Sequence, residues 1–136
     1  MKTIIATIKP QHLGNIRAGL KLYEMRKTCP AEVPFRVLCC QSQSGGKILA
    51  EFVVESPLKV RPLVFPELVR GTCVFMHEAE EYAKGKEIWF WDINDMIDYC
   101  STKGHRVRNI AEFGLKRAPQ SWCYIKHLND NKNNGG

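Results

Sequence analysis

The sequence predicts an α+β fold: a small, mostly antiparallel β-barrel with two or three short helices at its rim. Three observations favour this class. About six or seven short runs rich in β-branched and aromatic residues are distributed along 136 residues, a length typical of one domain. A turn that ends in Gly45-Gly46 joins two of these runs, as in a β-hairpin. No regular long helices separate the runs, which argues against a parallel α/β sheet.

The chain opens with a predicted strand over residues 3–8, followed by a short helix. Pro10 stands where helices tolerate proline best, at their first residue. Apolar residues then recur at helical spacing, at Leu13, Ile16 and Leu20. Gly19 is suited to end this helix in a left-handed turn.

A second strand, over residues 22–26, is predicted after this turn. Glu24 and Arg26 share one of its faces, because side chains along a strand repeat every second residue. Lys21 stands at the mouth of the strand. The corner formed by residues 8–27 therefore gathers many charges where a small domain begins its core.

The later elements follow from composition and from glycine and proline. Strands are predicted over 35–41, 47–55, 87–93 and 122–128. Helical composition covers 67–84, either as one helix or, because Gly71 weakens it, as two short pieces ended by Gly85. A short strand or a turn is predicted at 96–100. Irregular connections are predicted over 28–34, 56–66 and 101–121.

Residues 1–128 are expected to form one domain, and residues 129–136 a polar, flexible tail. Twenty Lys and Arg residues against 14 Asp and Glu residues give a net charge of +6. A positive surplus favours polyanionic partners, with nucleic acid first among them.

The six cysteines include no C-x-x-C pair, and the four histidines are scattered. We therefore expect free and mostly buried thiols, no structural metal and no cofactor. The apolar runs are shorter than a membrane span, and the first residues do not resemble a signal peptide. The protein is thus expected to be cytoplasmic, without a membrane partner, and a monomer is favoured.

Several short pieces of the sequence occur in an order shared with a known family. The first two are Ile8-Lys9-Pro10 and Ile16-x-x-Gly19-x-Lys21-x-x-Glu24-x-Arg26. The later ones are the hairpin segment Gly46-Lys47-Ile48-Leu49-Ala50-Glu51-Phe52 and the piece Pro119-Gln120-Ser121-Trp122-Cys123-Tyr124. Together they resemble the ASCH domain of the PUA-like superfamily of small β-barrels, in the stand-alone form found in bacteria and their phages.

The resemblance implies a PUA-like barrel with a cleft between the barrel and the first helix, acting in a bacterial cytoplasm that would be the host's for a phage-encoded protein. ASCH proteins are linked to RNA binding. Some are small hydrolases, among them ribonucleases and N4-acetylcytidine amidohydrolases that use a lysine, a threonine and a glutamate. Lys21 matches that lysine, whereas Glu24 stands where the threonine would be. The further glutamate would fall at or near 78–81.

The residues themselves leave the role of this corner open. A glutamate flanked by a lysine and an arginine is often a surface ion-pair group that contributes ~0–1 kcal/mol. The functional interpretation is a basic cleft that binds RNA or a modified nucleobase, or a nucleoside. Its predicted lining is Lys9, Lys21, Glu24, Arg26 and Tyr124. The alternative is a small hydrolase with Lys21 and Glu24 as catalytic residues, in which Glu78 or Glu81 manages the proton and the water.

Two features of the C-terminal half also allow two interpretations each. The basic segment 103–117 is either a solvated loop or a set of phosphate contacts. Ser121 is either a turn residue or a hydroxyl that orients a substrate, since the sequence has no G-x-S-x-G motif for a nucleophilic serine.

Overall fold

The computed structural model describes residues 1–125, which form nine strands, three α-helices and two short 3-10 helices. In chain order these elements are β1 (Lys2–Ile8), α1 (Pro10–Arg17), β2 (Tyr23–Arg26), β3 (Phe35–Gln41), β4 (Lys47–Val54), β5 (Leu58–Val60), η1 (Pro62–Val64), α2 (Pro66–Arg70), α3 (Met76–Ala83), β6 (Ile88–Asp92), β7 (Asn94–Asp98), β8 (Arg108–Asn109), η2 (Ile110–Phe113) and β9 (Trp122–Tyr124). The predicted tail and the end of the strand predicted over 122–128 lie outside the described residues.

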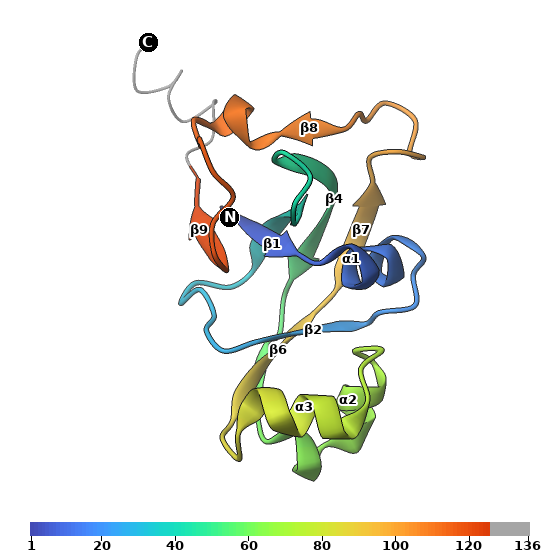
Figure 1. Cartoon of the computed structure of the whole chain (residues 1–136), viewed down its shortest axis with the longest axis vertical. Coiled ribbons are helices and arrows are strands. Elements are labelled where there is room, and N and C mark those ends of the chain that lie inside the picture. Colours follow the sequence, from blue (N-terminus) through green and yellow to red (C-terminus); the bar gives the residue numbers. More distant parts are fainter. Residues whose placement is uncertain (126–136) are drawn as a thin grey trace.

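The strands form two sheets. The larger has the order β7-β4-β3-β1-β9, with β8 also paired to β4, and the smaller has the order β2-β6-β5. Within the described residues β1 and β3 run parallel, and the other paired strands run antiparallel. The hairpin expected around Gly45-Gly46 is the β3–β4 pair. In Figure 1, α2 and α3 lie together at the end of the molecule opposite β8.

The α+β class, the short helices and the mostly antiparallel pairing are confirmed, whereas a closed barrel is not. The pairings of the described strands leave two separate sheets. The chain joins them, because Ile93 alone separates β6 of the smaller sheet from β7 of the larger. The carboxylate of Asp92 accepts hydrogen bonds from the backbone N–H of Glu55 at 3.0 Å and of Ser56 at 2.9 Å. Since these residues connect β4 to β5, the Asp92 side chain joins two of the four places within residues 1–125 where the chain crosses between the sheets.

The larger sheet is buried on both of its faces. Along β1, Ile4 belongs to the apolar cluster that contains Trp91 of the smaller sheet, whereas Ile5 belongs to the cluster on the opposite face. The same alternation places Cys39 in the first cluster and Cys40 in the second. A third cluster packs α2 and α3 against β6.

All six cysteines are free, as predicted, but Cys73 and Cys100 are exposed, so the expectation of mostly buried thiols is only partly correct. Residues 1–125 contain no group of His, Cys, Asp and Glu side chains that could hold a metal ion. No helix within that range is long and apolar enough to cross a membrane.

Two predictions of irregular structure are partly wrong. The region 56–66 contains β5 and η1, and the region 101–121 contains β8 and η2. β5 has three residues and β8 has two, too few for an alternating pattern to be visible, and they extend because they pair with β6 and β4. The apolar stripe of α1 also ends early, so Leu20 is 65% exposed. The helical segment is two helices, the second of the two predicted options.

We expect the substitution Gly46→Ala to destabilise the protein by about 1–3 kcal/mol, because its backbone is left-handed and closely packed. Gly46 has a φ of +85°, and a Cβ atom there would lie 2.6 Å from Cγ1 of Ile110. Gly14→Ala is the matched control, since nothing lies within 4 Å of a Cβ at that helical position. It should stabilise the protein by roughly 0.5–1 kcal/mol. Urea unfolding measures both, and equal stabilities would contradict the packing of the β3–β4 turn.

Candidate functional site

The corner between α1 and β2 directs Lys21 into the protein. Gly19 has a φ of +76°, the left-handed conformation in which helices often end. The carbonyl of Asn15 then accepts hydrogen bonds from the N–H groups of Leu20 and Lys21, at 3.0 and 3.1 Å. The next two residues donate to the carbonyl of Gly71, which precedes α3. These backbone bonds fix where Lys21 leaves the helix and where β2 begins.

Lys21, Glu24 and Arg26 converge in a group that we call the ionic cluster. Oε1 of Glu24 lies 3.4 Å from Nζ of Lys21. Oε2 of Glu24 accepts hydrogen bonds from Nε and Nη2 of Arg26, at 3.1 and 2.8 Å. Because Glu24 and Arg26 are two residues apart on β2, they lie on the same face of the strand. One carboxylate thus faces two cations, and the cluster carries a net charge of +1.

Arg26 joins the smaller sheet to the larger one. Its Nη2 donates to the carbonyl oxygen of Thr7 on β1 at 2.8 Å. Its Nη1 donates to the carbonyl oxygen and the Oγ of Ser121 at 3.3 and 3.2 Å, just before β9. The guanidinium carbon also lies 5.6 Å from the ring centre of Trp91. With the two bonds to Glu24, all five N–H groups of this side chain have an acceptor.

The ionic cluster is buried beneath the protein surface and does not line an open cleft. Lys21, Glu24 and Arg26 are 2%, 6% and 8% exposed. Nζ of Lys21 donates to the carbonyl oxygen of Thr72 at 2.6 Å in addition to its ion pair with Glu24. An ammonium group has three N–H donors, so within residues 1–125 one donor of Lys21 has no acceptor.

His12, in the first turn of α1, lies against this cluster. Its Nδ1 is buried and has no hydrogen-bond partner among the described residues. The pKa of His12 is lowered from its usual value, by burial first and by the positive charge of Lys21 second. The imidazole is therefore neutral at pH 7. Sequence reasoning missed His12 among scattered histidines, although its place in the helix that leads to Lys21 was a usable signal.

The other predicted site residues lie at the surface. Lys9 is exposed at the start of α1, and Tyr124 is 49% exposed on β9, edge-to-face with Trp122 at 5.3 Å. Glu78 and Glu81 are exposed on α3. Within the described part of the chain, no hydrogen bond or ion pair links the latter two side chains to the ionic cluster.

Tyr82 of α3 is a neighbour of the cluster that the sequence did not indicate. Burial raises the pKa of its hydroxyl, and the positive charge of Arg26 opposes that rise. The ammonium group of Lys27 lies 4.9 Å from the centre of the Tyr82 ring, a cation–π contact. Tyr82 is therefore the α3 side chain that these contacts place beside the end of β2.

Comparison with known proteins identifies the fold. No family model matches the sequence, and no curated protein matches it. Among solved structures, the ASCH protein from Zymomonas mobilis matches with a TM-score of 0.75 and 14% identity, over 98% of this chain and 94% of that one. A tyrosine-to-phenylalanine variant of that protein matches with a TM-score of 0.75 and 14% identity, over 99% of this chain and 98% of that one.

A serine-to-alanine variant of the same Zymomonas mobilis protein matches with a TM-score of 0.74 and 14% identity, over 98% of this chain and 95% of that one. At this level of identity the likeness concerns the fold. The chain has the ASCH fold, as its motifs predicted.

Replacing the carboxylate of Glu24, at the centre of the ionic cluster, should lower the stability of the protein. We expect Glu24→Gln to destabilise the protein by about 3–5 kcal/mol, because two nearly buried cations would lose their counter-charge. Glu81→Gln removes a carboxylate at an exposed position and should change stability by less than about 0.5 kcal/mol. Urea unfolding at pH 7 measures both, and comparable stabilities would show that water reaches the cluster in solution.

The lowered pKa of His12 predicts a loss of stability in mild acid. As the pH falls below about 6.5, the unfolded chain takes up a proton on His12 while the native chain resists it, so the unfolded state is favoured. The drop in unfolding free energy between pH 7 and pH 5.5 should therefore be smaller in His12→Gln than in the wild type. His77→Gln, at an exposed position, controls for loss of an imidazole. An unchanged drop in His12→Gln contradicts the placement of His12.

Proposed function

We propose that this protein binds RNA, or a modified nucleobase carried by RNA, at the corner between α1 and β2. The observation that carries the proposal is the unused hydrogen-bonding capacity beside a net positive charge. One N–H of Lys21 and the Nδ1 of His12 have no partner within residues 1–125. Lys21 is only 2% exposed, so a phosphate or base carbonyl oxygen would accept from it once the residues that cover it move aside, and a base amino or imino group would pair with His12.

Exposed cations at the same corner favour an anionic ligand. The charge of Lys9 acts on His12, so Lys9 lies near the cluster, and Lys27 is exposed at the end of β2. Neither forms an ion pair with an acidic residue in the described part of the chain. Their field adds to the +1 of the cluster and attracts phosphate groups.

On β9, three residues beyond the Ser121 that Arg26 contacts, a half-exposed aromatic side chain offers a stacking surface for a neighbouring base. Tyr124 presents about half of its surface, and its ring is held by Trp122, whose Nε1 donates to Oγ1 of Thr28 at 2.9 Å. A base stacked on such a ring typically gains ~1–3 kcal/mol. The ASCH resemblance also implies RNA binding. In this proposal Arg26 and Glu24 position Lys21 without contacting the ligand, since all five N–H groups of Arg26 are used and Glu24 is held between the two cations.

The test is the affinity for single-stranded RNA oligonucleotides as a function of salt. We expect the association constant to fall as salt rises, and the double variant Lys9→Ala/Lys27→Ala to lower the slope by about 0.7 for each phosphate that it no longer neutralises. Lys59→Ala/Lys86→Ala removes two exposed cations, one on β5 at the other edge of the smaller sheet and one just before β6, which the proposal does not place on the RNA, and it should leave the slope unchanged. Binding that does not respond to salt, or no binding at micromolar protein, contradicts the proposal.

The substitution Lys21→Met distinguishes the contribution of the ionic cluster from that of the surface cations. It removes the ammonium group of Lys21 and keeps the apolar stem. We expect it to weaken the binding of free cytidine or N4-acetylcytidine more than tenfold. Circular dichroism and thermal unfolding establish that the variant is folded. Nucleoside binding that survives in folded Lys21→Met excludes Lys21 as the contact.

A small hydrolase is the second candidate, and the neutral His12 beside Lys21 is what favours it. A neutral imidazole can take a proton from water, and an ammonium can stabilise a developing oxyanion. The assay is incubation with N4-acetylcytidine and with end-labelled RNA. Products that form with the wild type and are absent with both His12→Gln and Lys21→Met would support this candidate. Products that persist in both variants point to a contaminant.

A further inference from the structure

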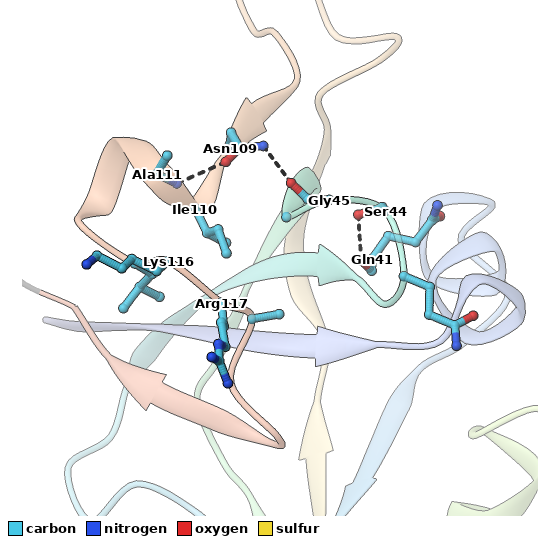
Figure 2. Close-up of a pocket in the computed structure, with 12 residues that line it drawn as sticks. Gln41, Ser44, Gly45, Asn109, Ile110, Ala111, Lys116 and Arg117 are labelled. Atoms are coloured by element: carbon cyan, nitrogen blue, oxygen red, sulfur yellow. Dashed lines mark hydrogen bonds between the residues drawn. The ribbon is translucent and has the colours of Figure 1, made fainter.

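A hollow of about 520 Å³ lies on the face of the larger sheet that is turned away from the smaller sheet. Figure 2 shows the turn between β3 and β4, with Gln41 and Gly45, on one side of this hollow and Lys116 and Arg117 on the other. Ile110 points into the space between them. We call this hollow the β3–β4 pocket.

The lining of the β3–β4 pocket is cationic and rich in hydrogen-bond donors. It consists of Gln41, Gln43, Ser44, Gly45, Gly46, Asn109, Ile110, Ala111, Leu115, Lys116, Arg117 and Ala118. No aspartate or glutamate is among these residues. Lys116 and Arg117 are exposed, and within residues 1–125 neither forms an ion pair. In Figure 2 the charged ends of Lys116 and Arg117 extend away from the β3–β4 turn, so both side chains would have to turn inward to meet a ligand in the pocket. Two such unneutralised cations on one wall suit a phosphate rather than a cation or an apolar ligand.

The walls of the pocket are held by hydrogen bonds between distant parts of the chain. Nδ2 of Asn109 donates to the carbonyl oxygen of Gly45 at 3.0 Å, and the N–H of Ile110 donates to that of Gly46 at 2.9 Å. Oγ of Ser44 donates to the carbonyl oxygen of Gln41 at 2.6 Å, a bond drawn in Figure 2. The pocket is therefore formed before a ligand arrives, which lowers the entropic cost of binding.

The pocket is close to the α1–β2 corner along the chain. Ala118 lines the pocket, and three residues later Ser121 accepts hydrogen bonds from Arg26. Three residues span at most about 11 Å. Thr7 fixes the segment, since its Oγ1 donates to the carbonyl oxygen of Pro119 at 2.6 Å and its N–H to that of Ser121 at 2.9 Å. At the ~3.4 Å phosphate rise of a stacked strand, roughly three nucleotides cover this distance.

We infer that the β3–β4 pocket is a second site, which binds phosphate groups of the RNA strand whose base occupies the α1–β2 corner. The RNA part of this inference rests on the proposed function, whereas the affinity of the pocket for phosphate does not. Lys116 and Arg117 supply the charge, and the side-chain amides of Gln41 and Gln43 and the second N–H of Asn109 supply hydrogen bonds. The strand then follows residues 116–121 from the pocket to the corner.

The first experiment tests the pocket alone. Titration of ¹⁵N-labelled protein with inorganic pyrophosphate should shift the amide signals of Gly45, Gly46 and Ala111. The shifts should disappear in Lys116→Ala/Arg117→Ala and remain in the matched control Lys59→Ala/Lys86→Ala. Absence of shifts at millimolar pyrophosphate, or shifts that persist in Lys116→Ala/Arg117→Ala, overturns the inference.

The second experiment tests continuity with the corner, using a 12-nucleotide RNA and free cytidine, which carries no phosphate, as probes. Lys116→Ala/Arg117→Ala should weaken the 12-mer about tenfold and lower its salt slope by about 1.4, the contribution of two neutralised phosphates. Binding of cytidine should not change. If wild type and variant bind the 12-mer equally well, the pocket does not bind phosphates of that RNA strand, and the proposed function still stands. If neither probe binds, the proposed function fails together with the RNA part of the inference, and the pyrophosphate titration decides the pocket.

Discussion

The guanidinium group of Arg26 is the contact on which the relation between the two sheets depends. It starts on β2, pairs with Glu24 and donates to the carbonyl oxygens of Thr7 and Ser121 in the larger sheet. A charge at 8% exposure is tolerated only with complete hydrogen bonding, and the planar group with five donors provides it. A lysine could not replace it, because three donors on a single nitrogen cannot reach a carboxylate and two separate strands. The joint between the sheets and the candidate site are thus one structure.

The positive charges of this protein lie partly in the buried ionic cluster and partly on the surface. Inside, Glu24 neutralises one of two cations, so a single positive charge remains at Lys21 and His12 stays neutral beside it. Outside, Arg106 and Arg108 are paired with Glu112, whereas Lys9, Lys116 and Arg117 form no ion pair within residues 1–125. The nucleic-acid proposal draws on the unpaired cations near the two ends of the 116–121 segment, although other exposed lysines, such as Lys59 and Lys86, are also unpaired within residues 1–125.

Sequence reasoning recovered the elements whose patterns are local. Periodicity and glycine placement predicted α1, β2 and the β3–β4 hairpin, and the spacing of Glu24 and Arg26 predicted that they share a face. It could not predict that the cluster is buried, because the groups that cover and satisfy it, the carbonyls of Thr72 and Ser121, are 51 and 95 residues away along the chain. β5 and β8 were missed for the same reason: each is held in place by a distant partner strand. A closed barrel was expected from strand number, whereas pairing shows two sheets linked by chain crossings.

Because β9 comes last in the chain, its position limits the order in which the protein can fold during synthesis. Ser121, whose carbonyl oxygen accepts a hydrogen bond from Arg26, is synthesised 95 residues after that arginine. β1 likewise pairs with β3 early in the chain and with β9 only near residue 124. During synthesis on a ribosome, the hairpin and the smaller sheet can assemble first, while the guanidinium remains hydrated. Complete burial of the charged centre therefore requires the last strand, and a nascent chain stalled before residue 121 would lack the finished corner.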